Sequence, residues 1–156
     1  YKTILAKNEG VSIICASRNL VSMLPNSSVN EVSRGAYIVS PEEGHLDGIL
    51  ISSGEDLQMT MALQKRLLSK GQEMRVVSMV STSRFSLEDD LYQDEILPNS
   101  VPKFVIESST GYAYYPWLTE KDQLFCLRRF GYSGTCEQVK EKLHFDIDSI
   151  EKEILH

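Results

Sequence analysis

The stretch GILISSGEDLQMTMALQKRLLSKGQEMRVVSM, residues 48–79, decides the fold class of this chain. Its apolar run at 48–51 predicts a buried strand, which leads into a turn of small residues at 52–54. The spacing of leucine and methionine over 55–70 predicts an amphipathic helix, and the apolar run at 74–79 predicts another strand. A strand, a helix and a strand joined by short connections form a βαβ unit, whose two strands are parallel.

The predicted helix at 55–70 has one apolar side. We expect its buried face to contain Leu57, Met61 and Leu68, widened by Met59, Leu63 and Leu67. Its first turn carries Glu55 and Asp56, which suit the positive end of the helix dipole. The free amides at such an end attract anions, but two carboxylates already stand there. We therefore expect a self-capped helix rather than a ligand site.

The remaining pattern extends this unit into a full domain. Further strands are predicted at 36–39, 104–106 and 124–127, and further helices at 87–97, 136–145 and 146–155. Asp146 is placed to cap the last helix. The aromatic stretch at 112–117 is expected to pack between elements or at a protein interface. Together these predict an α/β fold, a three-layer sandwich in which helices cover both faces of a mostly parallel (mixed) five-stranded sheet.

Composition narrows the function. The chain has 156 residues, 42% of them hydrophobic, and a formal net charge of -6 with a pI of about 5.1. An acidic surface repels phosphate backbones, so we expect no nucleic-acid partner. No apolar run approaches the length that spans a bilayer, so we expect no membrane partner. The cysteines Cys15, Cys126 and Cys136 have no disulfide or metal-ligand spacing, which favours free thiols in a reducing cytoplasm.

No set of residues forms a recognisable catalytic, cofactor or metal site. The run Gly131-Tyr132-Ser133-Gly134 lacks the spacing of a hydrolase elbow, and we interpret it as a turn before a helix capped by Ser133 or Thr135. Acidic pairs and runs occur at 42–43, 88–90 and 94–95, and they are expected to be solvated. The three histidines, His45, His144 and His156, have no visible partner pattern. The residues thus describe an α/β domain without an active site of its own.

The N-terminal part has a different composition. The apolar run at 11–16 predicts a strand, and the Ser- and Asn-rich stretch that follows, with Pro25, predicts a linker. The chain starts at Tyr1 without a methionine, which suggests a piece of a longer protein. An apolar strand with free edges seeks a partner, so we expect it to pack on a neighbouring copy or to fold back on its own domain.

Several motifs in order resemble the C-terminal domain of transketolases. They are GAYIV at 35–39, RVVSM at 75–79, YQDEILP at 92–98, FVIE at 104–107, RFGYSG at 129–134, and HF at 144–145, where the family usually has Gly-Phe. The resemblance covers nearly the whole chain. It implies three parts: the end of the preceding pyrimidine-binding domain at 1–20, a linker at 21–34, and the transketolase C-terminal domain at 35–156.

The resemblance also implies a site residue. Ser17-Arg18-Asn19-Leu20 is similar to the family's Ser-Arg-Gln-Asn-Leu signature, with the Gln missing. The arginine of that signature binds the substrate phosphate, which suits a guanidinium. Arg18 is therefore the candidate phosphate-binding residue, and no catalytic, cofactor-binding or metal-binding residue is expected in this chain.

Transketolases transfer a two-carbon ketol unit between sugar phosphates in the pentose phosphate pathway, with thiamine diphosphate and a divalent metal such as Mg as cofactors. The resemblance implies that the full-length homodimeric, cytoplasmic enzyme is active and that this chain, which lacks the cofactor motifs, is inactive alone. Its expected partner is the rest of the transketolase chain. The alternatives are a separate non-catalytic subunit of a split transketolase, or the same domain of a deoxyxylulose phosphate synthase or a 2-oxo-acid dehydrogenase component.

Overall fold

The computed structural model describes residues 2–6, 10–24, 26–28 and 30–156. Its elements, in chain order, are α1 (Lys2–Ala6), the 3-10 helix η1 (Glu31–Arg34), β1 (Ala36–Ser40), β2 (Gly48–Ser52), α2 (Asp56–Leu68), β3 (Met74–Met79), α3 (Thr82–Phe85), α4 (Asp90–Ile96), β4 (Lys103–Glu107), the 3-10 helix η2 (Tyr112–Trp117), β5 (Gln123–Cys126), α5 (Cys136–Lys142) and α6 (Ile147–Ile154).

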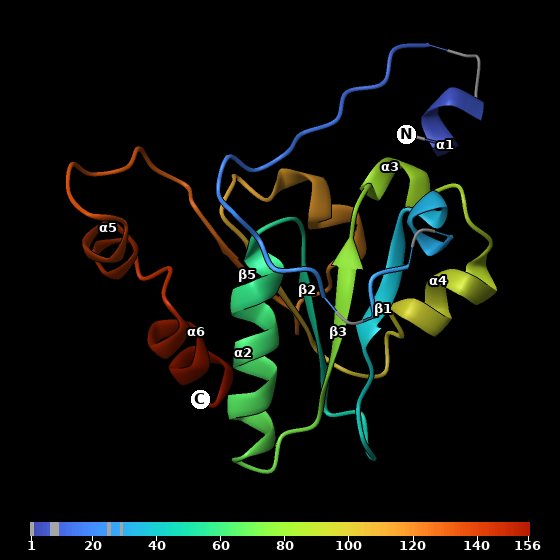
Figure 1. The fold of residues 1–156 in the computed structure, drawn as a ribbon. Helices are drawn as coiled ribbons and strands as arrows, with labels where there is room; N and C mark the ends of the chain where they lie inside the picture. Colours follow the sequence, from blue (N-terminus) through green and yellow to red (C-terminus); the bar gives the residue numbers. More distant parts are fainter. Residues whose placement is uncertain (1, 7–9, 25, 29) are drawn as a thin grey trace.

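One mixed sheet organises the domain (Figure 1). Its strand order is β1-β3-β2-β4-β5. β2 runs parallel to both β3 and β4, and β4 runs parallel to β5, whereas β1 is antiparallel to β3. Ile51 of the central strand β2 pairs with Val77 on one side and Val105 on the other. The predicted βαβ unit and the mostly parallel five-stranded sheet are both confirmed.

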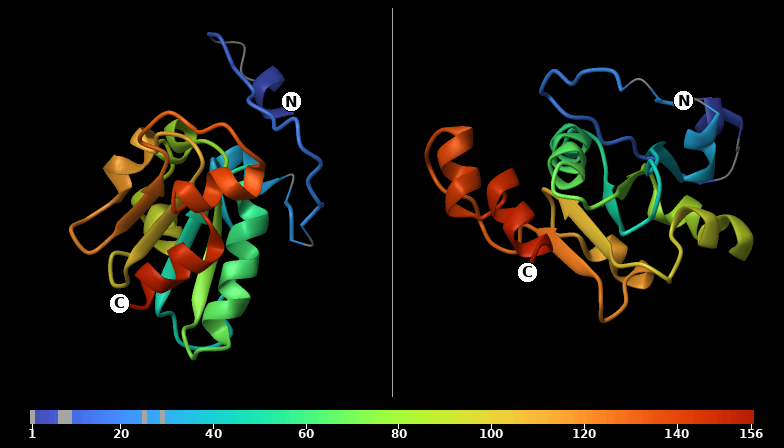
Figure 2. Two further views of the ribbon diagram at one scale, coloured as in Figure 1. Left: turned by 90° about the vertical axis from the view of Figure 1, so that its left-hand side faces the viewer. Right: turned by 90° about the horizontal axis from the view of Figure 1, so that it is seen from below.

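Helices cover both faces of this sheet, as the views in Figure 2 show. On one face, side chains of α2 and α6 pack against alternate strand residues such as Leu50, Val76 and Phe104. On the other face, α3, α4 and η2 pack against the intervening residues Ile51 and Val105. Alternation of side chains along each strand produces the two apolar cores, and the predicted three-layer sandwich is confirmed.

The helix α2 differs from its prediction in the face that it buries. Its fully buried residues are Asp56, Leu57, Thr60, Leu63 and Leu67. Met61 and Leu68, which were expected at the centre of the face, are only half-buried. The helix is turned because the Thr60 hydroxyl donates to the Ser52 hydroxyl at 2.9 Å, which puts this polar residue against the sheet. Apolar periodicity alone does not reveal such a buried hydroxyl pair.

Helix caps explain most of the remaining boundaries. The helix predicted at 87–97 begins later, as α4, because the Asp89 carboxylate accepts a hydrogen bond from the Tyr92 N–H. The short helix α3 before it was not predicted. Asp146 caps α6 as expected, by accepting from the Ser149 N–H at 2.9 Å. Thr135 caps α5 with a reciprocal capping box.

A left-handed residue joins the last two helices. His144 has a φ of +53°, the one positive φ among the non-glycine residues that the structure describes. This conformation strains a residue with a Cβ and suits glycine. The geometry accounts for the glycine that the resembled family carries at this place.

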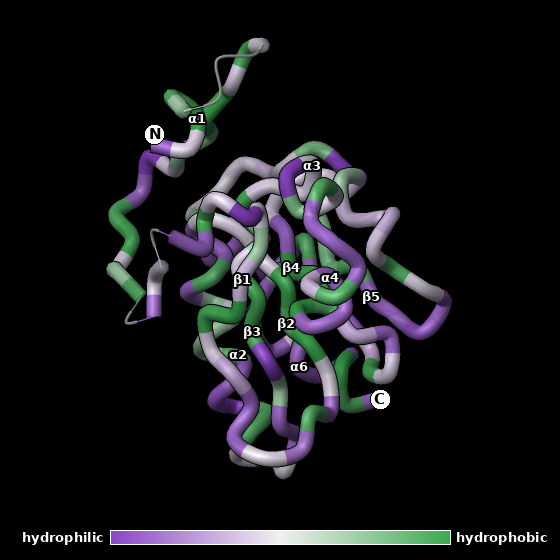
Figure 3. Tube along the Cα trace, turned by 90° about the vertical axis from the view of Figure 1, so that its right-hand side faces the viewer, coloured by the Kyte–Doolittle hydropathy of each residue, from purple (hydrophilic) through white to green (hydrophobic). Residues whose placement is uncertain are grey.

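The predicted strand at 11–16 is wrong. Residues 10–16 form neither helix nor strand, and Val11 and Ile13 are 94% and 83% exposed. Figure 3 shows this part of the chain standing clear of the body, with apolar segments outside the core. A strand exists only when another backbone takes its N–H and C=O groups, and no described segment of the chain pairs with these residues. They do not fold back onto the domain, and their packing on a neighbouring copy stays a prediction.

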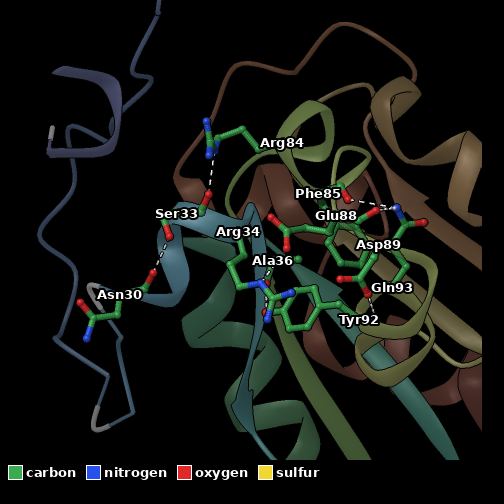
Figure 4. Close-up of polar contacts among 10 residues, drawn as sticks. All are labelled: Asn30, Ser33, Arg34, Ala36, Arg84, Phe85, Glu88, Asp89, Tyr92 and Gln93. Carbon is green, nitrogen blue, oxygen red and sulfur yellow. Dashed lines mark hydrogen bonds and ion pairs between the residues drawn. The ribbon is translucent and has the colours of Figure 1, made fainter. Parts of the chain in front are cut away.

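The segment before β1, which the sequence predicts to be a linker, is fixed where it meets the sheet (Figure 4). The Arg34 guanidinium donates to the Glu88 carboxylate at 2.7 Å and lies 3.1 Å from the centre of the Tyr92 ring. The Arg84 side chain donates to the Ser33 carbonyl at 2.8 Å. The predicted linker therefore ends in a rigid anchor that holds the start of β1 against α3 and α4.

Candidate functional site

The carboxyl ends of the parallel strands β2 and β4 meet at one edge of the sheet. The Glu107 carboxylate, at the end of β4, accepts hydrogen bonds from the hydroxyls of Ser53 and Tyr114, each at 3.0 Å. Burial, together with the charge of Glu107, raises the pKa of Tyr114 well above its usual value. Tyr114 thus remains a proton donor to Glu107 throughout the physiological range.

A second carboxylate lies beside this pair. Asp56 is only 6% exposed, and it accepts a hydrogen bond from the Ser108 N–H at 2.7 Å. Burial raises the pKa of Asp56, and the hydrogen bonds from Ser108 oppose this rise. The negative charges of Glu107 and Glu55 add to the increase. The edge is therefore acidic, with its buried carboxylates already satisfied by protein donors.

Glu55, the first residue before α2, does not cap its helix. No side-chain capping bond forms there, so the expectation of a self-capped helix is wrong. Instead the carboxylate accepts hydrogen bonds from the Ser17 hydroxyl and, at 3.0 Å, from the Asn19 side-chain amide. These bonds lower the pKa of Glu55, and Lys140 lowers it further. The carboxylate of Glu55 therefore binds Ser17 and Asn19 of the tail instead of the backbone N–H groups of its own helix.

Ser17, Arg18 and Asn19 form a compact turn at this point. The Asn19 N–H donates to the Ser17 hydroxyl oxygen at 2.9 Å, which closes the turn on itself. Figure 1 shows the tail passing the N-terminal end of α2 here. Arg18 stands between the two anchored residues with its side chain exposed. No hydrogen bond or ion pair joins it to another residue within the described part of the chain.

The structure thus brings the predicted site residue Arg18 to the carboxyl edge of the sheet. Sequence reasoning missed Glu55 as its neighbour, because 36 residues separate Glu55 from Asn19. The sequence contains no periodic or motif signal for this contact.

Other polar predictions have mixed outcomes. Two members of the acidic runs are ion-paired rather than solvated: Glu42 with Arg75 at 2.6 Å, and Glu88 with Arg34. The aromatic stretch packs between elements in part, since Tyr114 is buried and the rings of Trp117 and Phe85 lie 4.7 Å apart.

The described residues do not fit thiamine diphosphate or its metal. Over 2–6, 10–24, 26–28 and 30–156, no three His, Cys, Asp or Glu side chains gather where they can hold a metal ion. At the carboxyl edge, the hydroxyls of Ser53 and Tyr114 already donate to Glu107, so they are not free to bind a diphosphate. A cavity of about 550 Å³ lies between β5 and α6. Gln123, Phe125, His144 and Lys152 are among its lining residues, whereas Glu55, Asp56 and Glu107 are not.

The helices of the domain are short or polar. None in the described part of the chain combines the length and the apolar character needed to cross a bilayer.

Comparison with known proteins defines the family. Residues 35–146 match the model of the transketolase-like TK C-terminal domain. The chain is 28% identical to a transketolase of Nostoc sp. and 32% identical to a transketolase of Buchnera aphidicola, over 153 residues in each case. Both alignments cover 96% of this chain and 23% of the relative, so the chain spans about a quarter of the length of these proteins.

Solved structures show the same fold. A transketolase mutant from Pichia stipitis superimposes with a TM-score of 0.79 at 23% identity, covering 88% of this chain and 20% of that one. An inactive β4 tetramer of a split-gene transketolase gives a TM-score of 0.61 at 17% identity, covering 77% of this chain and 41% of that one. The chain is a transketolase-type C-terminal domain with a sheet edge that binds its own N-terminal tail. It belongs to the transketolase family.

Proposed function

We propose that this chain is the C-terminal part of an active transketolase and that its tail delivers Arg18 to the phosphate of the sugar substrate. The observation that carries the proposal is an exposed arginine without an internal partner, held on a turn at the carboxyl edge of a transketolase C-terminal domain. A guanidinium binds a phosphate through two parallel N–H donors, and an arginine already paired to a carboxylate does so less well.

The proposal divides the chain into three parts. Residues 1–20 end the preceding pyrimidine-binding domain, residues 21–34 are the linker, and residues 35–156 are the C-terminal domain. The match of the family model from residue 35 and the anchor at Arg34 support this division. The rest of the enzyme, as a cytoplasmic homodimer, supplies thiamine diphosphate, its divalent metal and the catalytic groups. When bound, thiamine diphosphate stabilises the carbanion of the transferred ketol unit.

The test uses a complete transketolase that contains this segment. We expect Arg18→Ala to raise KM for fructose 6-phosphate roughly 10- to 100-fold, since a charge-assisted pair contributes about 1.5–3 kcal/mol. KM for unphosphorylated fructose should not change. Arg18→Lys, which keeps the charge but loses the planar fork, should fall between the two. Equal losses with both sugars would show that Arg18 does not bind phosphate.

A second measurement addresses the chain itself. We expect the isolated chain, supplied with thiamine diphosphate and Mg²⁺, to show no ketol transfer, because its residues do not fit the cofactor. Ketol transfer by the chain alone would contradict the proposal.

The likeness to a split-gene transketolase keeps one alternative in view, a separate subunit. An immunoblot of native extract decides between them. A band several times heavier than 17.6 kDa supports a long polypeptide, and a band near that mass supports a subunit.

A further inference from the structure

The contact between Glu55 and the tail suggests a role for a residue to which nothing in the family resemblance gives a function. We propose that Glu55 is a positioning residue that fixes the Ser17-Arg18-Asn19 turn so that Arg18 points at the substrate phosphate. This inference rests on the proposed role of Arg18. It adds the residue that sets the direction of that side chain.

The geometry of the contact carries the inference. One carboxylate holds both residues that flank Arg18. It accepts from the Ser17 hydroxyl, and its two oxygens accept from the Asn19 side-chain amide nitrogen at 3.0 and 3.2 Å. The Ser17 hydroxyl in turn accepts from the Asn19 N–H. A turn fixed on both sides has little freedom left at its centre, so the Cα–Cβ direction of Arg18 is set by Glu55.

The support behind Glu55 is rigid. It directly precedes α2, whose Leu57 and Leu63 lie in the core and whose first residue, Asp56, is bonded to Ser108 after β4. Outside this contact the neighbouring tail residues at 10–16 and 20–23 are exposed and form no helix or strand. Glu55 therefore links the otherwise unsupported segment to the most firmly packed helix of the domain.

Charge gives a second reason for the arrangement. The lone pairs of the Glu55 carboxylate are occupied by Ser17 and Asn19, and Lys140 of α5 lies close enough to favour its charge. Arg18 forms no ion pair with it among the described residues. The acid thus holds the neighbours of the arginine while its guanidinium stays available for a phosphate.

The energetic effect follows from preorganisation. An arginine on a loose segment has to be ordered each time substrate binds, which weakens binding of the phosphate. Glu55 has no contact with the reacting carbon atoms in this scheme. Its loss should therefore change KM for phosphorylated substrates and leave kcat largely unchanged.

The experiment uses the complete holoenzyme with fructose 6-phosphate and with fructose. We expect Glu55→Ala to raise KM for fructose 6-phosphate about tenfold, the effect of losing one or two hydrogen bonds to a charged group. KM for fructose and kcat for either sugar should stay within twofold. Glu55→Gln, whose amide oxygen still accepts one hydrogen bond, should recover part of the loss. Gln58→Ala, an exposed change on the next turn of α2, is the matched control and should behave as wild type.

Two further variants make the result decisive. The pair Ser17→Ala with Asn19→Ala removes the same bonds from the tail side and should reproduce the effect of Glu55→Ala. In an Arg18→Ala background, Glu55→Ala should have no additional effect on KM, because a positioning residue acts only through the group that it positions.

The outcomes separate the two proposals. If Arg18→Ala acts on phosphorylated sugar and Glu55→Ala does not, Glu55 has no positioning role while the function of Arg18 stands. Additive effects in the double variant, or equal losses with fructose, overturn the positioning role in the same way. If Arg18→Ala itself has no phosphate-specific effect, both proposals fail together.

Discussion

Two short apolar runs of this chain differ in structure: one lies in a buried strand, and the other is exposed and forms no strand. Residues 36–39 belong to β1, in which Ala36 and Val39 are 0% and 1% exposed. Residues 11–16 have comparable apolar and β-branched content, yet Val11 and Ile13 are almost fully exposed. The first run pairs with β3 and is held at its start by Gly35 and Arg34, while the second pairs with no strand among the described residues. Strand propensity needs a partner before it becomes a strand.

A substitution that disturbs the start of β1 should reduce the stability of the domain more than any other change considered below. Gly35 has a φ of +88°, and a Cβ there would lie 2.4 Å from the Phe85 nitrogen and 2.6 Å from the Ser81 oxygen. We expect Gly35→Ala to lower the free energy of unfolding by about 4 kcal/mol, because left-handed strain adds to backbone overlap. Urea denaturation measures it. Gly54→Ala, with positive φ but open space around it, is the control and should cost clearly less.

The second prediction concerns a buried ion pair, a kind of contact that stabilises the folded domain. The Asp122 side chain is 0% exposed and that of Lys103 is 1% exposed, and the two are 3.4 Å apart. Asp122→Ala leaves the ammonium without its carboxylate, which should cost about 3 kcal/mol of stability. Asp94→Ala removes an exposed carboxylate and should cost less than about 0.5 kcal/mol. Equal effects of the two variants in thermal unfolding would contradict this reasoning.

Acid titration tests the same contact without substitution. Burial on its own raises the pKa of Asp122, but hydrogen bonds from Thr119 and Lys103 lower it overall. A carboxyl whose pKa is lower in the folded state stabilises the fold above its ordinary pKa of about 3.9, and this contribution is lost as the pH falls through the lowered value. We expect stability to fall below about pH 4, and to fall less in Asp122→Ala. Asp56, whose pKa is raised, has the opposite sign.

The last prediction compares the two apolar runs directly, by replacing one valine in each and measuring the free energy of unfolding. Val39→Ala should destabilise this chain by about 2 kcal/mol, because it leaves a cavity in a packed core. Val11→Ala should change the unfolding free energy by less than about 0.5 kcal/mol. In the complete transketolase, by contrast, a partner for residues 11–16 would make Val11→Ala costly as well. A loss of stability from Val11→Ala in the isolated chain would show that the tail is packed in solution.

How far the sequence predicts the structure depends on the distance over which a signal acts. The βαβ unit at 48–79 and the caps at Thr135 and Asp146 depend on neighbours a few residues away, and all are confirmed. The positive φ of His144, where the resembled family usually has glycine, was not predicted and is a finding of the structure. The buried face of α2 was wrong in part, because Thr60 bonds to Ser52 of the preceding strand.

In the candidate site, too, the local feature was predicted from the sequence and the long-range contact was not. Arg18 was identified as a candidate from a local signature, but Glu55, which binds the residues on either side of it, was assigned to a helix cap. Helix-end propensity is worth about 1 kcal/mol, and two donors brought by the tail are sufficient to override it.

By itself, the sequence determined the α/β class, the parallel core of the sheet, the family and the identity of the candidate phosphate-binding arginine. Tertiary structure alone decided that residues 11–16 form no strand, that Arg34 packs on Tyr92 just before β1, and that Glu55 binds the turn around Arg18. The physical reason is that periodicity and capping record contacts within one element. A contact between residues 36 apart exists only once the chain has brought them together.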